Sequence, residues 1–171
     1  PSYYMGSPKG AELAARIDFD YLHHLAIGPE SHAVLGKIEA DRETLLSGGS
    51  LPKPGDLLPL SFELGFRELG DGGAPCTVHL ILRSDLAPAS VDTFVEIFRD
   101  YAHTLLPGFR GEDGGTVVDL GANEGFYTLR MKLLNPAVRV VAAEPLCENA
   151  ELFRANLEAN GMPGVILREA A

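Results

Sequence analysis

The stretch Thr116-Val-Val-Asp-Leu-Gly-Ala-Asn-Glu-Gly125, which Glu144-Pro145 follows further along the chain, decides the fold class. A short β-branched run leads into a glycine turn, a helical segment follows, and a second apolar run ends in a carboxylate. This is the order of the first βαβ unit of a doubly wound sheet, which binds nucleoside ligands at the carboxyl ends of its strands. The sequence therefore predicts an α/β fold with a nucleoside site beside this turn.

The turn itself has the pattern Asp-x-Gly-x-x-x-Gly. It lacks both the Gly-x-Gly-x-x-Gly fingerprint of nicotinamide enzymes and the Lys-Ser/Thr of a P-loop. Dinucleotide turns are free of side chains because a pyrophosphate must reach the helix N-terminus. Here Asp119 ends the strand and Glu124 lies in the turn, so two carboxylates would stand where a pyrophosphate binds. A cationic ligand fits such a turn better, and S-adenosylmethionine carries both a sulfonium and an ammonium.

Four further positions around the turn have a chemical reason to contact such a ligand. Gly121 and Gly125 allow positive φ and let the backbone approach the ligand. Asn123 offers both a donor and an acceptor. Glu144 is expected to accept hydrogen bonds from both ribose hydroxyls, as the acidic residue after the second strand does in dinucleotide folds. The alternative is an ordinary strand–helix turn that binds no ligand.

The composition limits the classes of partner. The chain has 171 residues, of which 46 % are hydrophobic, and a formal net charge of −10. This charge argues against nucleic acid and anionic membrane as partners, because both favour Lys/Arg patches. No apolar run has the length of a membrane span. Cys76 and Cys147 lie far apart in the sequence and fit a reduced, cytoplasmic setting better than a disulfide framework.

Periodicity and turn residues predict the elements along the chain. In the first part we expect a helix at 11–26, a helix at 31–46 capped by Ser31, a linker-like stretch at 47–59, hairpin strands at 60–68 and 76–83, and a helix at 91–106 capped by Ser90. In the nucleotide-type part we expect a strand at 116–120, a helix at 124–134, a strand at 138–143, a helix through 146–157 and a strand at 165–167.

These elements suggest three regions. They are a helical N-terminal or lid region at 1–58, a β-hairpin and helix at 59–115, and the first half of a Rossmann-like ligand-binding domain at 116–171. The overall expectation is a doubly wound α/β fold, with its first three strands present, behind an α+β lid region. A doubly wound sheet has about six strands, so we expect the chain to be the front part of a longer protein.

Three segments together resemble the FkbM family of S-adenosylmethionine-dependent O-methyltransferases. They are Val117-Val-Asp-Leu-Gly-Ala-Asn-Glu-Gly-Phe-Tyr127, Ala143-Glu-Pro-Leu-Cys-Glu-Asn149 and Ala155-Asn-Leu-Glu-Ala-Asn-Gly161. Upstream, Leu82-Arg83 and Asp92-Thr-Phe-Val-Glu-Ile-Phe98 resemble the segment that precedes the family's first core strand. The chain departs from the family pattern at Glu124, where an apolar residue is more usual.

The resemblance implies S-adenosyl-L-methionine as the cofactor and methyl transfer to a hydroxyl of a natural-product, lipid or sugar-like acceptor. The acceptor would be a small molecule or carrier-bound, and a polyketide or peptide megasynthase is a plausible context. The implied cofactor contacts are Asp119, Gly121, Ala122, Asn123, Gly125, Tyr127, Glu144, Pro145 and Leu146.

The sequence does not identify a catalytic base. The adjacent pair His23-His24 could face a site if its helix is a lid, or could be ordinary surface histidines. His79 and His103 are expected on solvent-facing positions of a strand and a helix. Asp92 and Tyr101 could approach the cofactor, although a capping Asp and a core Tyr explain them equally well. No His, Asp or Glu cluster has metal-ligand spacing.

Two other function classes stay open at this point. A methyltransferase-like fold can serve as a non-catalytic docking or scaffold module, but such a module has no need of Asp119, Gly121, Gly125 and Glu144. A nicotinamide-dependent oxidoreductase is disfavoured by the missing third glycine and the acidic turn.

Overall fold

The computed structural model describes residues 17–50, 55–69, 74–100 and 115–170. The chain divides into two compact units. The first unit consists of Pro1–Glu63 and Thr77–Val95, and the second of Leu64–Cys76 and Glu96–Ala171. No helix among the described residues is long and apolar enough to cross a membrane.

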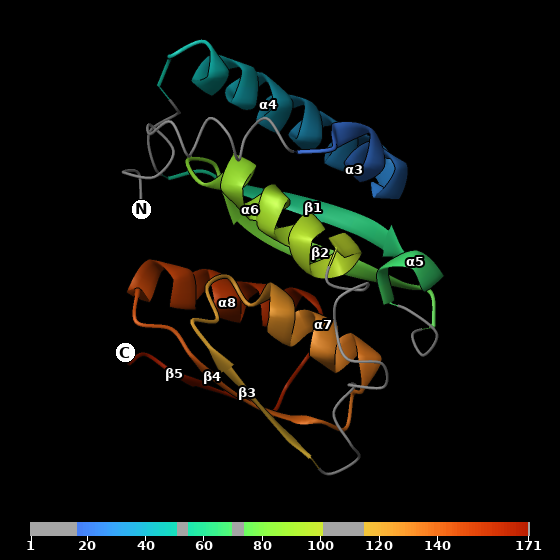
Figure 1. The fold of residues 1–171 in the computed structure, drawn as a ribbon, viewed down its shortest axis with the longest axis vertical. Helices are drawn as coiled ribbons and strands as arrows, with labels where there is room; N and C mark the ends of the chain where they lie inside the picture. Colours follow the sequence, from blue (N-terminus) through green and yellow to red (C-terminus); the bar gives the residue numbers. More distant parts are fainter. Residues whose placement is uncertain (1–16, 51–54, 70–73, 101–114, 171) are drawn as a thin grey trace. The chain divides into compact units, whose positions relative to one another are not determined.

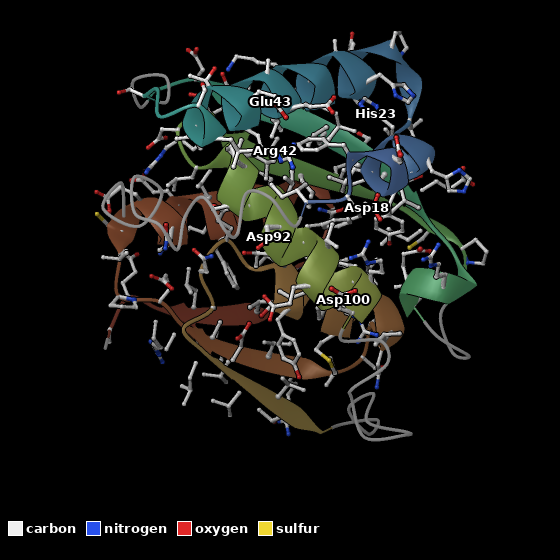
Figure 2. All side chains as sticks on the ribbon, turned by 45° about the horizontal axis from the view of Figure 1, so that its top comes forward. Asp18, His23, Arg42, Glu43, Asp92 and Asp100 are labelled. Carbon is white, nitrogen blue, oxygen red and sulfur yellow. The ribbon has the colours of Figure 1, made fainter. Side chains whose placement is uncertain are left out.

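The first unit begins with helix α3, Phe19–Leu25. Its start is fixed by Asp18, labelled in Figure 2, whose carboxylate accepts a hydrogen bond from the N–H of Tyr21 at 3.0 Å. The expected helix at 11–26 is therefore wrong at Ile17 and Asp18, because Asp18 is the N-cap and the helix starts at Phe19. Residues 11–16 lie outside the described part of the chain.

Helix α4 is longer than expected at its N-terminal end and spans Gly28–Leu46. Ser31 was expected as its cap, but it lies inside the helix, and its hydroxyl accepts the N–H of Ser61 at 3.0 Å. The helix instead starts with Pro29 in its first turn, where the missing N–H of proline costs nothing. Arg42 on this helix, labelled in Figure 2, lies over the ring of Phe19, with 5.8 Å between the guanidinium carbon and the ring centroid.

Strands β1, Leu57–Leu64, and β2, Cys76–Arg83, form the expected hairpin, and their arrows run in opposite directions in Figure 1. Strand β1 begins at Leu57, which lies inside the stretch 47–59 that we expected to be linker-like. Buried and exposed residues alternate along both strands, so one face packs against the core of the unit.

Helix α6, Ala87–Val95, closes the first unit. It begins before the expected position 91, and Ser90 is not its cap, because the Ser90 hydroxyl donates to the carbonyl of Leu86 one turn earlier. Its core contact is the ring of Phe94, which stacks on Phe62 of β1 with 4.8 Å between centroids.

In the second unit, a short helix α5, Phe66–Leu69, occupies positions that we expected to extend the strand to Glu68. The strand ends because the Glu68 carboxylate accepts the N–H of Gly65 at 2.9 Å and so caps this helical turn. Residues Glu96–Asp100 form a π-helical turn, η1. The rest of the helix expected at 91–106 lies outside the described residues.

The nucleotide-type part of the second unit has a parallel three-stranded sheet in the order β3-β4-β5. The strands are β3 (Thr116–Leu120), β4 (Arg139–Ala143) and β5 (Val165–Arg168), and the connecting helices are α7 (Phe126–Leu134) and α8 (Cys147–Ala159). Val118 pairs with Val141, and Val141 pairs with Ile166. This confirms a mixed α/β fold with the strand–helix alternation that the sequence predicted.

Figure 1 shows α7 and α8 on the same side of this sheet. The core beneath them consists of two clusters, one of Val117, Met131, Val138 and Val140 and one of Ala122, Ala142 and Phe153. Helix α7 starts at Phe126 rather than at position 124, because Gly125 is in the left-handed conformation with φ of 87°. Both connections therefore lead the chain back along one face, and the ends of β3 and β4 lie side by side.

Candidate ligand site

The centre of the candidate site is Glu144, which directly follows β4 and is 4 % exposed. Its Oε2 accepts the backbone N–H of Asn123 at 2.8 Å, and its Oε1 accepts the N–H of Leu146 at 3.0 Å. Oε1 also accepts the side-chain amide of Asn149 at a longer 3.4 Å. Glu144 thus joins the turn after β3 to the turn after β4.

Asp119, near the end of the neighbouring strand β3, is the second buried carboxylate, with 8 % of its surface exposed. Its Oδ2 accepts the hydroxyl of Thr128 at 2.6 Å. Burial raises the pKa of the Asp119 carboxyl above its usual value, the hydrogen bond from Thr128 lowers it, and repulsion by Glu144 raises it. The carboxylate that acts on Asp119 is therefore Glu144.

The two glycines of the turn serve different purposes. Gly121 has φ of 76°, and a Cβ atom added there would meet nothing within 4 Å. Its N–H and that of Ala122 both donate to the carbonyl of Ala143, at 2.9 and 3.0 Å. A Cβ atom at Gly125, in contrast, would lie 2.7 Å from the ring of Phe153 on α8. Open space for a ligand therefore exists at Gly121, whereas Gly125 allows two helices to pack.

Asn123 is the non-glycine residue with positive φ, at 49°, within the described part of the chain. Asparagine tolerates this conformation better than most residues. Its N–H is held by Glu144, and its half-buried side chain belongs to the turn that we expected to face a ligand. The expectation that Asn123 contacts a ligand stays a prediction.

The other residues implied by the FkbM resemblance have varied positions. Ala122 lies in the core cluster with Phe153, and Tyr127 packs against the cluster around Met131. Pro145 and Leu146 are exposed beside Glu144. The Ala122 side chain is thus buried, whereas Leu146 offers an exposed apolar surface at the site.

Two residues at the site were not anticipated from the sequence. Thr128 is fully buried on α7 and binds Asp119, and Asn149 on α8 reaches Glu144. Each pair joins residues on different elements. The sequence signal for these contacts is weak, because the separations of nine and five positions follow no recognised motif.

The histidines considered as candidate bases belong to the first unit. Nδ1 of His23 lies 3.0 Å from Nδ1 of His32, and the two rings are within 6° of parallel. One ring therefore donates to the other at the protein surface. His24 is exposed, and His79 pairs with the Ser61 hydroxyl at 2.8 Å on the exposed face of the hairpin. Asp92 lies on α6, and Tyr101 and His103 lie outside the described residues.

The two cysteines and the possible metal ligands complete the list of reactive side chains. Cys76 and Cys147 are both free thiols. Among the residues that the structure describes, no group of three or more His, Cys, Asp or Glu side chains is arranged to hold a metal ion.

The residues around Gly121 fit the cationic and ribose portions of S-adenosylmethionine. A carboxylate has about four acceptor positions, and three donors already reach Glu144. Glu144 can therefore accept one further hydrogen bond, and two if a ligand donor replaces the long contact from Asn149. Oδ1 of Asp119 accepts no side-chain hydrogen bond from the described residues, and the carboxylate carries a charge that a cation would neutralise.

The sequence matches no protein-family model and no curated protein. Among solved structures, the chain is similar to a protein-L-isoaspartate O-methyltransferase, with 20 % identity and a TM-score of 0.31. The similarity covers 57 % of this chain and 25 % of that protein, so the chain spans about a quarter of its length. A similarity of this size leaves the FkbM resemblance untested.

Proposed function

We propose that this chain carries the cofactor-binding turn of an S-adenosylmethionine-dependent methyltransferase with a Rossmann-like fold. The observation that supports this most is the pair of buried carboxylates, Asp119 and Glu144, at the ends of adjacent parallel strands. Burial and, to a smaller extent, repulsion by Glu144 raise the pKa of Asp119, and a cationic ligand relieves this repulsion. An anionic pyrophosphate would increase the negative charge of this edge instead.

We assign the roles of the site residues from the acceptor capacity that remains on the two carboxylates and from the open space at Gly121. Glu144 accepts hydrogen bonds from ribose hydroxyls, Asp119 neutralises the cationic portion of the ligand, and Gly121 leaves space for the ligand beside the backbone. When bound, S-adenosylmethionine supplies a methyl group activated by its sulfonium. Much of the rate of such a transfer comes from positioning the acceptor oxygen. A base for the acceptor hydroxyl is not assigned among the described residues.

The FkbM resemblance supports a hydroxyl oxygen as the methyl acceptor. A small or carrier-bound natural product, lipid or sugar-like molecule has this chemistry, and a polyketide or peptide megasynthase would provide such a carrier. The formal net charge of −10 supports a partner other than nucleic acid or an anionic membrane. We propose a cytoplasmic location, because both cysteines are free thiols.

Isothermal titration calorimetry with S-adenosylhomocysteine and with NAD distinguishes the function classes. We expect S-adenosylhomocysteine to bind and NAD not to bind, because NAD brings a pyrophosphate to the two carboxylates. Binding of NAD alone would favour an oxidoreductase. Binding of neither ligand would contradict a cofactor site and favour the scaffold module.

A further inference from the structure

The hydroxyl of Thr128 is the one side-chain donor that reaches Asp119 from the described residues. Thr128 has no exposed surface, so water cannot replace its hydroxyl without rearrangement of α7. The contact of 2.6 Å between Thr128 Oγ1 and Asp119 Oδ2 is short, as expected when a hydroxyl donates to an ionised carboxylate. It fixes Oδ2 of Asp119, and no other side chain among the described residues donates to this carboxylate.

Asp119 needs such a donor because its other neighbours oppose its negative charge. Burial between β3 and α7 removes water from the carboxylate, and Glu144 at the end of β4 repels it. Among the described residues, Glu144 is the charged group that acts on Asp119, and Thr128 is the neighbour that stabilises its ionised form. Loss of the Thr128 hydroxyl would leave only the backbone N–H of Thr128 to offset these two effects.

We infer that Thr128 is a positioning residue of the proposed cofactor site, whose hydroxyl holds Asp119 ionised and orients its carboxylate toward the ammonium of the ligand. This inference rests on the proposed function for the identity of the ligand. It also gives the site a pH response. Affinity for a ligand with an ammonium group increases as Asp119 ionises, and Thr128 sets the pH at which this happens.

Thr128→Val tests this role, because valine has nearly the same shape but no hydroxyl. The first measurement is the carboxyl ¹³C titration of Asp119 in the ligand-free protein by NMR. We expect the midpoint to move to higher pH in Thr128→Val and to return in Thr128→Ser. Thr93→Val is the matched control, because the Thr93 hydroxyl donates to the carbonyl of Ala89 and not to a carboxylate. If the valine variant does not fold, Thr128→Ala provides the same comparison.

The second measurement is the affinity for two probes at several pH values. S-adenosylhomocysteine carries the ammonium, whereas 5′-methylthioadenosine lacks the amino acid portion. Below the new midpoint, we expect Thr128→Val to bind S-adenosylhomocysteine about tenfold more weakly, with little change for 5′-methylthioadenosine. An unchanged Asp119 midpoint would overturn the inference even if the cofactor analogue binds. Failure of the wild-type protein to bind either probe would overturn the proposed function, and the Asp119 titration would still decide whether Thr128 controls its ionisation.

Discussion

The carboxylate of Glu144 and the backbone N–H of Asn123 are joined by a hydrogen bond of 2.8 Å, which links the ends of β4 and β3. Asn123 has positive φ, so this bond stabilises a turn that the backbone does not favour by itself. The same carboxylate holds the N–H of Leu146. Glu144 therefore shapes the turn of the candidate site in the absence of any ligand.

Glu144→Ala is predicted to reduce both stability and ligand binding. The N–H groups of Asn123 and Leu146 would lose their acceptor, and we expect the free energy of unfolding to fall by about 2–4 kcal/mol. Affinity for S-adenosylhomocysteine should fall at least about tenfold through loss of the ribose contact. Urea denaturation and calorimetry measure the two effects. Glu151→Ala removes an exposed carboxylate from the adjacent helix α8 and should change neither quantity.

Substitution by alanine is predicted to cost more stability at Gly125 than at Gly121. In Gly125→Ala, the new Cβ atom would lie 2.7 Å from the ring of Phe153, and together with the positive φ this should cost about 2–4 kcal/mol of stability. In Gly121→Ala, the Cβ atom meets no neighbour, so only about 1–2 kcal/mol of backbone strain is expected.

For ligand affinity we expect the reverse order, with the larger loss in Gly121→Ala. Gly121→Ala should lose affinity for S-adenosylhomocysteine beyond its effect on stability, because the methyl group projects into the space left for the ligand. Comparison of urea midpoints with calorimetric affinities for the two variants gives the measurement. Equal affinities of wild-type protein and Gly121→Ala would place the ligand away from this turn.

The sequence predicted the βαβ part more accurately than the first unit, for a physical reason. Strands β3 to β5 and their helices are separated by turn glycines such as Gly125 and Gly161, and both of these residues have positive φ in the structure. In the first unit, Ser31 and Ser90 each precede an apolar run and resemble caps. Their hydroxyls instead bind the backbone of Ser61 and Leu86, and the sequence does not reveal these partners.

The same distinction applies to the site. Asp119 and Glu144 were predicted because each ends an apolar strand, where parallel strands place their ligand-binding residues. Thr128 and Asn149 were not predicted, because their contacts depend on the rotation of α7 and α8 about their axes. The sequence placed Glu124 in the turn, where a pyrophosphate would bind. In the structure Glu124 is 2 % exposed, and its backbone carbonyl accepts a hydrogen bond from the side-chain amide of Asn156.

Asp119→Asn is predicted to stabilise the free protein at neutral pH while weakening ligand binding. Burial and Glu144 raise the pKa of Asp119 in the folded state above its unfolded value. The folded protein therefore binds the proton more tightly. The stabilising contribution of Asp119 is fully present below its unfolded pKa and is lost as the pH rises through the folded pKa.

Asparagine does not titrate, so the stability difference between Asp119→Asn and the wild-type protein should increase over the same pH range. Free energies of unfolding measured from about pH 3.5 to 7 test this sign. A wild-type protein that gains stability relative to the variant as the pH rises would contradict it. Asp56→Asn, at an exposed position before β1, provides the control.

Arg130 on α7 supplies the last prediction, because the residue is 3 % exposed and burial lowers the pKa of its guanidinium. Its Nε and Nη1 atoms are buried and make no hydrogen bond in the structure described. An uncompensated buried charge destabilises a folded protein, and an apolar side chain of similar length avoids this cost. We therefore expect Arg130→Met to raise the free energy of unfolding by about 1–3 kcal/mol.

Lys132→Met is the matched control on the same helix. The Lys132 ammonium donates to the carbonyls of Pro136 and Val138 at 2.7 and 3.1 Å, so its loss should cost about 1 kcal/mol. The two substitutions remove the same charge from positions two residues apart, and they should shift the urea midpoint in opposite directions. A destabilised Arg130→Met would mean that the guanidinium has an anionic partner in the folded protein, and the pair would then be identified by a charge-swap double mutant.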